Sequence, residues 1–270
     1  MGLKLIQNLK KCLKNKINPH YIDLLTNGEK MKTFNLKSIV SKFLLFIIIA
    51  APLYAQEFSV GTDVVSRYIW RGIESGGNTP SIQPTISFSA GGFTAGFWGA
   101  LPTANPKGLN EIDIYANYAI NLTTAGSFTL GVTDYTFPNS GTKIGNFHNW
   151  DDPKGPGAHF LEGNLIYSAP ESFPIYLSFN IFFYNVENNP IYIEAGYSTS
   201  LKDVGVDVFA AATPGESKGY YGVSNFSVIN TGLKISKEIK VTDSFSFPVF
   251  GSVILNPANE DLFFVLGFSL

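Results

Sequence analysis

Residues 110–121, NEIDIYANYAIN, alternate between apolar and polar side chains along their whole length. One face carries apolar groups, namely Ile112, Ile114, Ala116, Tyr118 and Ile120. The other face carries polar or acidic groups, namely Glu111, Asp113, Tyr115, Asn117 and Asn121. A period of two is typical of a β-strand whose two faces meet different surroundings. The segment is longer than the roughly 5–6 residues of a common globular strand and suits the roughly 9–11 residues of a tilted membrane strand.

The same alternation recurs along the chain after residue 56, and no segment there shows a convincing helical period. Residues 81–89, 174–186 and 190–201 are clear examples. The pattern predicts twelve strands, at 57–71, 80–90, 92–101, 110–121, 126–137, 158–168, 174–186, 190–201, 203–212, 224–236, 243–255 and 260–270. The sequence therefore predicts an all-β fold.

The connections between these segments alternate in length. Short turns follow every second strand, as at 89–92, 121–126, 168–174 and 201–203, with a somewhat longer one at 236–243. The other connections are mostly longer and richer in Pro, Gly and Asn, as at 102–110, 138–157 and 213–223, although 186–189 is short. Short turns at one end and long loops at the other are a feature of outer-membrane barrels.

The polar face separates a membrane barrel from a soluble β-sandwich. A sandwich presents its polar face to bulk water, so that face would be rich in Lys, Glu and Arg. Here it is mostly Ser, Thr, Asn, Gly and Tyr, and the apolar face is rich in Phe, Ile, Leu and Val. Large apolar groups outside and small polar groups inside suit a barrel in lipid. We therefore expect a transmembrane antiparallel β-barrel of about 12 strands, in contact with the lipid of a bacterial outer membrane.

The N-terminal region predicts export. Residues 43–55, FLLFIIIAAPLYA, follow Met31 and three lysines, which is the layout of a secretory signal peptide. The apolar run is shorter than the roughly 20 residues of a spanning helix. We expect a signal peptide at 31–55 that carries the chain through the inner membrane and is cleaved before Gln56. The barrel then occupies 56–270. Residues 1–30 are interpreted as an upstream extension from a start codon assigned too early, or else as an extended targeting segment.

Charge and cysteine content exclude several classes of protein. Residues 1–55 hold 9 of the 19 basic residues and 2 of the 21 acidic ones, which leaves residues 56–270 with a net charge of −9. Such an acidic chain lacks the basic footprint of a nucleic-acid binder. The single cysteine, Cys12, lies upstream of the expected cut, so no disulfide is available. No nucleotide-binding loop or CxxC motif is present, and no cofactor is expected.

The last ten residues, DLFFVLGFSL, have a membrane-strand pattern of their own. One face would carry Leu262, Phe264, Leu266, Phe268 and Leu270. This ending resembles the C-terminal signal that outer-membrane barrels present to their insertion machinery. Those signals usually end in Phe, whereas this chain ends in Leu270.

Residues 57–71 raise the question of why Arg67 and Arg71 lie in an alternating segment. If the strand runs to Arg71, both arginines share a face with Asp63, and Tyr68 and Trp70 lie on the opposite face. Charge on the lipid face costs about 2–4 kcal/mol at the bilayer centre, so the arginines should face the lumen. The charged residues expected in the lumen are Asp63, Arg67, Arg71, Glu111, Asp113, Glu162, Glu194 and Asp207. The arginines either brace the barrel interior through ion pairs or form a constriction that meets solute, and the two roles are compatible.

Catalysis is not expected. Only His148 and His159 follow the predicted cut, and no Ser or Cys is placed by the sequence beside either one. The longest loop offers Phe147, His148, Trp150, Asp151 and Asp152 as outer-loop candidates. Their spacing matches no calcium loop, so no metal site is expected. The two aromatic side chains would fold over the barrel mouth or anchor at the membrane interface.

One stretch resembles a known family. SRYIWRGI at 66–73 and PSIQPTISF at 80–88 are similar to the opening strands of TorF-type porins, which carry a Gcw_chp-like domain. The likeness to the family patterns S-x-Y-x-x-R-G-x-S and P-x-x-Q rests on Ser66, Tyr68, Arg71, Gly72, Ser75, Pro80 and Gln83, with Glu74 inserted before Ser75. The resemblance implies an outer-membrane β-barrel whose solutes are largely undefined.

The expected function is passive passage of small polar solutes or ions. Twelve strands enclose a narrower lumen than the 16–18 strands of general porins. Two alternatives stay open at this point: a structural barrel whose outer loops engage partners, and a lipid-modifying enzyme of the outer membrane.

Overall fold

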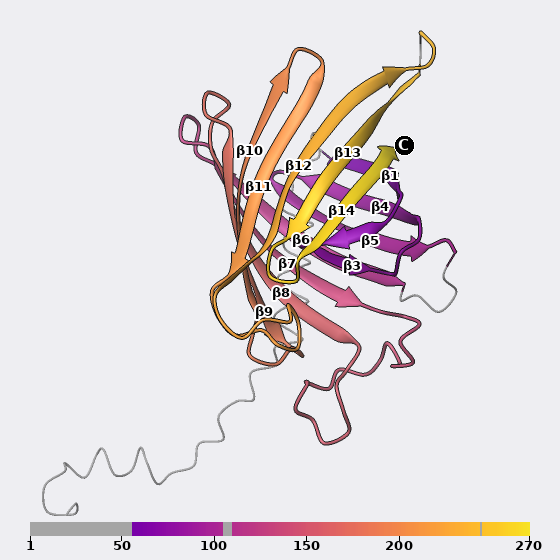
Figure 1. Ribbon diagram of the computed structural model, residues 1–270, viewed down its shortest axis with the longest axis vertical. Helices are drawn as coiled ribbons and strands as arrows, with labels where there is room; N and C mark the ends of the chain where they lie inside the picture. The colour runs from indigo at the N-terminus through magenta and orange to yellow at the C-terminus, as the bar shows by residue number, and fades with distance from the viewer. Residues whose placement is uncertain (1–55, 105–109, 244) are drawn as a thin grey trace, which may run out of the picture. The chain divides into compact units, whose positions relative to one another are not determined.

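The computed structural model describes residues 56–104, 110–243 and 245–270, and this part of the chain is all-β. Twelve of its strands form a closed antiparallel barrel, as the sequence predicts (Figure 1). They are β1 (Gln56–Val65), β4 (Ser81–Ala90), β5 (Phe93–Pro102), β6 (Glu111–Asn121), β7 (Ser127–Thr136), β8 (His159–Ser168), β9 (Ile175–Tyr184), β10 (Ile191–Leu201), β11 (Val204–Thr213), β12 (Ser227–Lys240), β13 (Ser246–Asn256) and β14 (Asp261–Ser269).

Each of these strands pairs with the next along the chain, and β1 closes the ring by pairing with both β4 and β14. The expected signal peptide at 31–55 and the extension at 1–30 lie outside the described residues. The described residues contain no helix with the length and apolar character needed to cross a membrane.

The two faces of the barrel wall differ as the alternation predicts. On β6, Ile112 and Ile114 are exposed, whereas Glu111 and Asp113 are buried. On β14, Leu262 and Phe264 are exposed and the intervening Phe263 is buried. Exposed apolar side chains occur on the other strands of the ring as well; Phe97 on β5, for example, is 52% exposed. The wall therefore carries an apolar outer surface around an interior that holds both buried acids and buried apolar side chains.

The connections divide between the two ends of the barrel (Figure 1). Short turns join β4 to β5, β6 to β7, β8 to β9, β10 to β11 and β12 to β13. The other end carries the longer connections 66–80, 137–158 and 214–226, together with the short 185–190 and 257–260. β12 runs to Lys240, four residues beyond its predicted end, so its following turn is shorter than the expected 236–243.

The predicted strand at 57–71 is wrong in its second half. β1 ends at Val65, and β2 (Tyr68–Trp70) and β3 (Ile73–Ser75) form a separate two-stranded sheet. Arg71 and Gly72 connect them with positive φ values of 50° and 77°, which is the geometry of a two-residue type I′ hairpin turn. The expected face of Tyr68 and Trp70 is therefore also wrong, because Tyr68 is buried inside the barrel, where its hydroxyl group donates to Glu111.

Candidate functional site

The β2–β3 hairpin lies inside the barrel, and its tip packs against the wall. Gly72 is required at this tip for two reasons: its φ is +77°, and an added Cβ would lie 2.2 Å from the carbonyl oxygen of Ile229. Asn256 on β13 donates from Nδ2 to the Gly72 carbonyl oxygen at 3.1 Å. The connection 66–80 thus starts at the end of the barrel that carries the longer connections and folds into the lumen.

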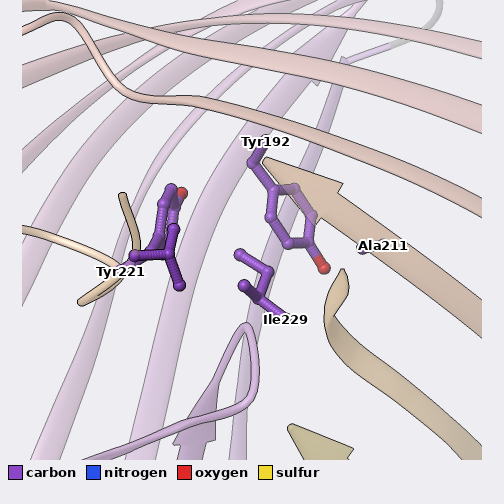
Figure 2. Close-up of a cluster of buried hydrophobic side chains, with 5 residues drawn as sticks. Tyr192, Ala211, Tyr221 and Ile229 are labelled. Atoms are coloured by element: carbon purple, nitrogen blue, oxygen red, sulfur yellow. The ribbon is translucent and has the colours of Figure 1, made fainter. Parts of the chain in front are cut away.

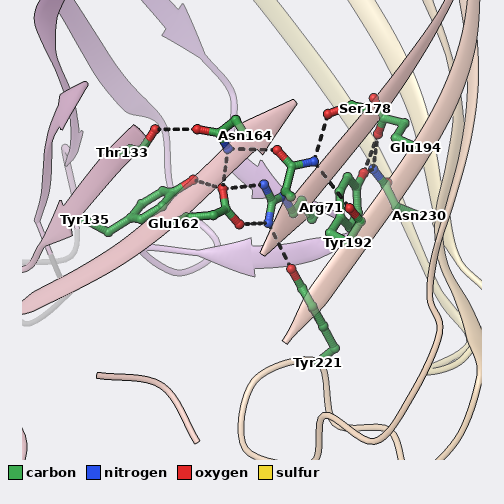
Figure 3. Close-up of polar contacts among 11 residues, drawn as sticks. Arg71, Thr133, Tyr135, Glu162, Asn164, Ser178, Tyr192, Glu194, Tyr221 and Asn230 are labelled. Atoms are coloured by element: carbon green, nitrogen blue, oxygen red, sulfur yellow. Dashed lines mark hydrogen bonds and ion pairs between the residues drawn. The ribbon is translucent and has the colours of Figure 1, made fainter. Parts of the chain in front are cut away.

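Arg71 at the tip makes a bidentate ion pair with Glu162 on β8. Its Nη1 lies 2.6 Å from Oε1 and its Nη2 lies 2.8 Å from Oε2 (Figure 3). Arg71 also donates from Nη1 to the hydroxyl oxygen of Tyr221 at 2.9 Å. Two parallel charge-assisted bonds fix both the position and the orientation of the guanidinium group.

Glu162 is fully buried, and its carboxylate has further partners on the wall. The Tyr135 hydroxyl group and Asn164 Nδ2 each donate to Oε2 at 2.9 Å. Asn164 Nδ2 also donates to Asn180 Oδ1 at 2.8 Å, which extends the network to β9. Removing one partner of a buried ion pair costs about 3–5 kcal/mol, because the other charge is left uncompensated. The pair therefore ties the hairpin firmly to β8.

Aromatic rings surround the same guanidinium group. Its central carbon lies 4.5 Å from the ring centre of Trp70 and 4.3 Å from that of Tyr192. Tyr221 comes from the connection 214–226 and belongs to a buried cluster with Tyr192, Ala211 and Ile229 (Figure 2). Burial raises the pKa of Tyr221 to about 12, so its hydroxyl group is neutral at physiological pH. The connections 66–80 and 214–226 therefore meet inside the lumen.

A second polar network lies on the neighbouring wall. Glu194 on β10 accepts from the Tyr176 hydroxyl group at 2.8 Å and also accepts from the Tyr192 hydroxyl group. Asn230 Nδ2 on β12 donates to the Tyr192 hydroxyl oxygen at 2.8 Å. Tyr192 thus links this network to the Arg71 guanidinium group that it faces.

Three cavities adjoin the hairpin within the described residues. The first, of about 230 Å³, is lined by Asp63, Arg67 and Lys234 among others. The second, of about 320 Å³, includes Arg71, Glu194, Asp207 and Lys234 in its lining. The third, of about 500 Å³, is lined largely by aromatic and amide side chains around Asp113. The lumen is therefore narrowed by the hairpin without being filled.

The charged residues that the sequence assigns to the lumen all lie on its inner side, but they do not form one cluster. Arg71 pairs with Glu162, and Arg67 pairs within its own loop with Glu74 at 3.3 Å. Sequence reasoning missed Lys234, although the alternation along 224–236 places it on the polar face. It also missed Tyr220 and Tyr221, which the flanking glycines made look like an ordinary loop.

The outer-loop candidates lie outside the lumen. Phe147 is 63% exposed and stacks on His159, with ring centres 4.0 Å apart. His148 Nδ1 lies 3.8 Å from Asp152 Oδ1, and Asp151 accepts a hydrogen bond from Asn149. Trp150 is also exposed. No group of three or more His, Cys, Asp or Glu that could hold a metal ion occurs in the part of the chain that the structure describes.

His159 itself has no free ring nitrogen. Nδ1 lies 2.7 Å from Asp134 Oδ2 on β7, and Nε2 lies 2.7 Å from the carbonyl oxygen of Ile144. Asp134 shares the outward face of Leu130 and Val132. Asp134 thus holds the imidazole of His159, and the bond to Ile144 fastens the loop 137–158 against the outer side of the rim.

These features define a class of protein: a closed β-barrel with an apolar exterior and a polar lumen that is narrowed by an inward-folded loop. The chain belongs to the bacterial family described as "Bacterial protein of unknown function (Gcw_chp)", whose model matches residues 50–239. No curated protein matches the sequence.

Proposed function

We propose that the protein is a bacterial outer-membrane channel for small polar solutes or ions, narrowed by the loop 66–80. The exposed apolar wall supports a membrane location. Contiguous apolar surface of this kind is avoided on soluble proteins because it drives association, and an outward apolar band is what a lipid-embedded barrel requires. The outer membrane is favoured because antiparallel membrane barrels of bacteria are found there, and the chain belongs to a bacterial family.

The observation that carries a transport role is the polar, charged and incompletely filled lumen. Cavities lie beside the hairpin on different sides, and they are lined by Asp63, Arg67, Asp113, Asp207 and Lys234. Charged side chains around open interior space are the materials from which channels build selectivity. The Arg71–Glu162 pair acts in this proposal as the bond that holds the narrow state.

Conductance of the protein as purified from outer membranes and placed in planar bilayers tests this function. We expect small or infrequent currents from the wild type and larger ones from Arg71→Ala/Glu162→Ala, because both charges that tie the hairpin to β8 are gone. The control is Lys218→Ala/Glu216→Ala, which removes an exposed ion pair of 3.2 Å in the connection 214–226. Its currents should equal those of the wild type.

A non-transporting interaction barrel is the second candidate. The hairpin together with Tyr220 and Tyr221 occupies much of the lumen, and the loop 137–158 exposes Phe147 and Trp150. This candidate predicts no current from either the wild type or Arg71→Ala/Glu162→Ala. It also predicts that the protein binds a partner and that this binding is lost when the loop 137–158 is shortened.

We further propose that the protein is not an enzyme and that β14 serves the barrel-insertion machinery. The geometry of His159 supports the first point, because its two ring nitrogens are engaged by Asp134 and Ile144 and, in the described part of the chain, contact no nucleophile. Hydrolysis of phospholipid by the purified protein would contradict it. Poor assembly of the Leu266→Asp barrel, together with normal export across the inner membrane, would support the role of β14 in insertion.

A further inference from the structure

The third cavity differs from the other two in its walls and in its charge. It is lined by Tyr68 and Trp70 of the hairpin, by Trp98, Tyr115 and Tyr135 of the wall, and by the carboxylate of Asp113. We propose that this cavity is a binding site for small organic cations that carry an ammonium group. The proposal rests on the proposed channel function, because the ligand reaches the cavity through the lumen.

The aromatic rings are held in place by one another. The ring centres of Tyr68 and Trp98 are 5.3 Å apart, and those of Trp70 and Tyr135 are 6.0 Å apart. The volume of about 500 Å³ leaves room for a small solute between them. A cation within about 6 Å of an aromatic ring centre is attracted by the negative face of the ring, by about 2 kcal/mol when it is desolvated.

The carboxylate at this cavity lacks a counter-charge. Asp113 is 6% exposed, and its Oδ1 has no hydrogen-bond partner in the described residues. The nearby Glu111 is also buried and accepts from the Tyr68 hydroxyl group at 3.2 Å. Glu162, in contrast, is neutralised by Arg71. A buried carboxylate is costly unless a proton or a cation compensates it. A cation that binds beside Asp113 therefore takes the place of the proton, which a neutral or anionic ligand cannot do.

The lining also decides the kind of cation. Mg²⁺ and Ca²⁺ need several oxygen ligands, and the third cavity is lined by one carboxylate and a few amide and hydroxyl groups among aromatic rings. An ammonium group, in contrast, needs one carboxylate and aromatic faces. The basic residues Arg67 and Lys234 line the first cavity, and β12, which carries Lys234, lies six places from β6 in the ring of strands. The first and second cavities set Lys234 beside the acids Asp63, Glu194 and Asp207, whereas the lining of the third cavity contains Asp113 and no basic side chain of the described residues.

The test compares choline with 3,3-dimethylbutanol, which has the same shape without the charge. Binding of each to the detergent-solubilised full chain is followed by calorimetry. We expect choline to bind at least about tenfold more tightly than the alcohol. Asp113→Asn should weaken choline binding by about tenfold or more and leave the alcohol unchanged. The matched control is Asp207→Asn in the second cavity, which should not alter choline binding.

Equal binding of choline and the alcohol would overturn the proposal, as would full choline binding by Asp113→Asn. No choline binding by the wild type would overturn it too, and so would tighter binding of a neutral sugar. Trp98→Leu gives a second variant, in which choline binding should fall while the acid remains. Choline binding without current in any variant would contradict the channel function but not the binding site. Current without choline binding would contradict the binding site but not the channel function.

Discussion

The loops 66–80 and 137–158 leave the same end of the barrel, and both carry aromatic and charged side chains, yet they take opposite paths. The first folds into the lumen, where Arg71 reaches Glu162 on β8. The second stays outside, where Phe147 and the carbonyl group of Ile144 hold His159 at the rim. β8 thus binds one loop on its inner face and the other on its outer face.

The difference shows what makes an inward loop stable. Inside, Glu162 is fully buried and receives donors from Arg71, Tyr135 and Asn164. Outside, His148 Nδ1 lies farther from Asp152 Oδ1, at 3.8 Å, and both side chains are partly exposed. Exposed pairs contribute about 0–1 kcal/mol, whereas breaking a buried one costs several times more. The inward loop is therefore held mainly where the charge of Arg71 finds a buried and fully bonded partner.

Removing the inner tie should have the largest effect. Arg71→Ala leaves Glu162 buried without a counter-charge, so we expect a loss of about 3–5 kcal/mol of stability. The measurement is the thermal unfolding temperature of the detergent-solubilised protein. His148→Ala removes the contact with Asp152, which lies within the loop 137–158, and should cost less than about 1 kcal/mol. Equal unfolding temperatures for the two variants would mean that the inward loop is held no more tightly than the loop 137–158.

A charge placed on the outer face of the barrel wall should have the next largest effect on stability. Phe179 on β9 is exposed and lies in register with Leu165 and Ile193, which are also exposed. Phe179→Arg should cost about 2–4 kcal/mol if this face meets lipid. The control is Thr85→Arg, which enters the third cavity beside Asp113. Assembly into outer membranes should fall for the first variant only; the reverse ranking would place water outside and break the membrane assignment.

The barrel wall could be predicted from the sequence because neighbouring residues of a strand alternate between its two faces. Every second residue along 110–121 shows which side meets apolar surroundings, and the structure confirms this assignment in β6. The inward hairpin could not be read in the same way. Residues 66–71 continue the alternation of β1, so periodicity alone carries the strand past Val65. The signal that was available is Arg71-Gly72 between YIW and IES, a two-residue turn flanked by short strands.

The pairing at the site was beyond local reasoning for another reason. Arg71 and Glu162 are 91 residues apart, and several inward acids were equally plausible partners. Which acid is reached depends on how far the hairpin tip extends across the lumen, and Gly72 sets that distance through its contact with Ile229. The sequence predicted inward charges but not their partners.

Gly72 and Gly141 give a matched test of how tightly the two loops are packed. Gly72 has a φ of +77° and no room for a Cβ, whereas Gly141 in the outer loop has a φ of +90° and nothing within 4 Å. Both alanine variants incur backbone strain of about 1–3 kcal/mol. Gly72→Ala adds a steric clash, so its unfolding temperature should be the lower of the two and its conductance should change. Identical behaviour would mean that the hairpin tip is free to move away from β12.

The smallest effect is expected at the ring that covers the outer rim. Phe147 stacks on His159 with an interplanar angle of 3°, but it is 63% exposed, so truncation removes little buried surface. Phe147→Ala should lower stability by less than about 1.5 kcal/mol, the upper value for an aromatic pair, because Asp134 and Ile144 still hold the imidazole. Conductance should stay at the wild-type level, since no atom of the lumen is altered. Unfolding curves and bilayer currents of this variant, recorded beside those of Arg71→Ala, measure directly how differently the two loops affect stability and conductance. If Phe147→Ala opened the channel, the loop 137–158 would control the lumen from outside, and the inner hairpin would no longer be the element that narrows it.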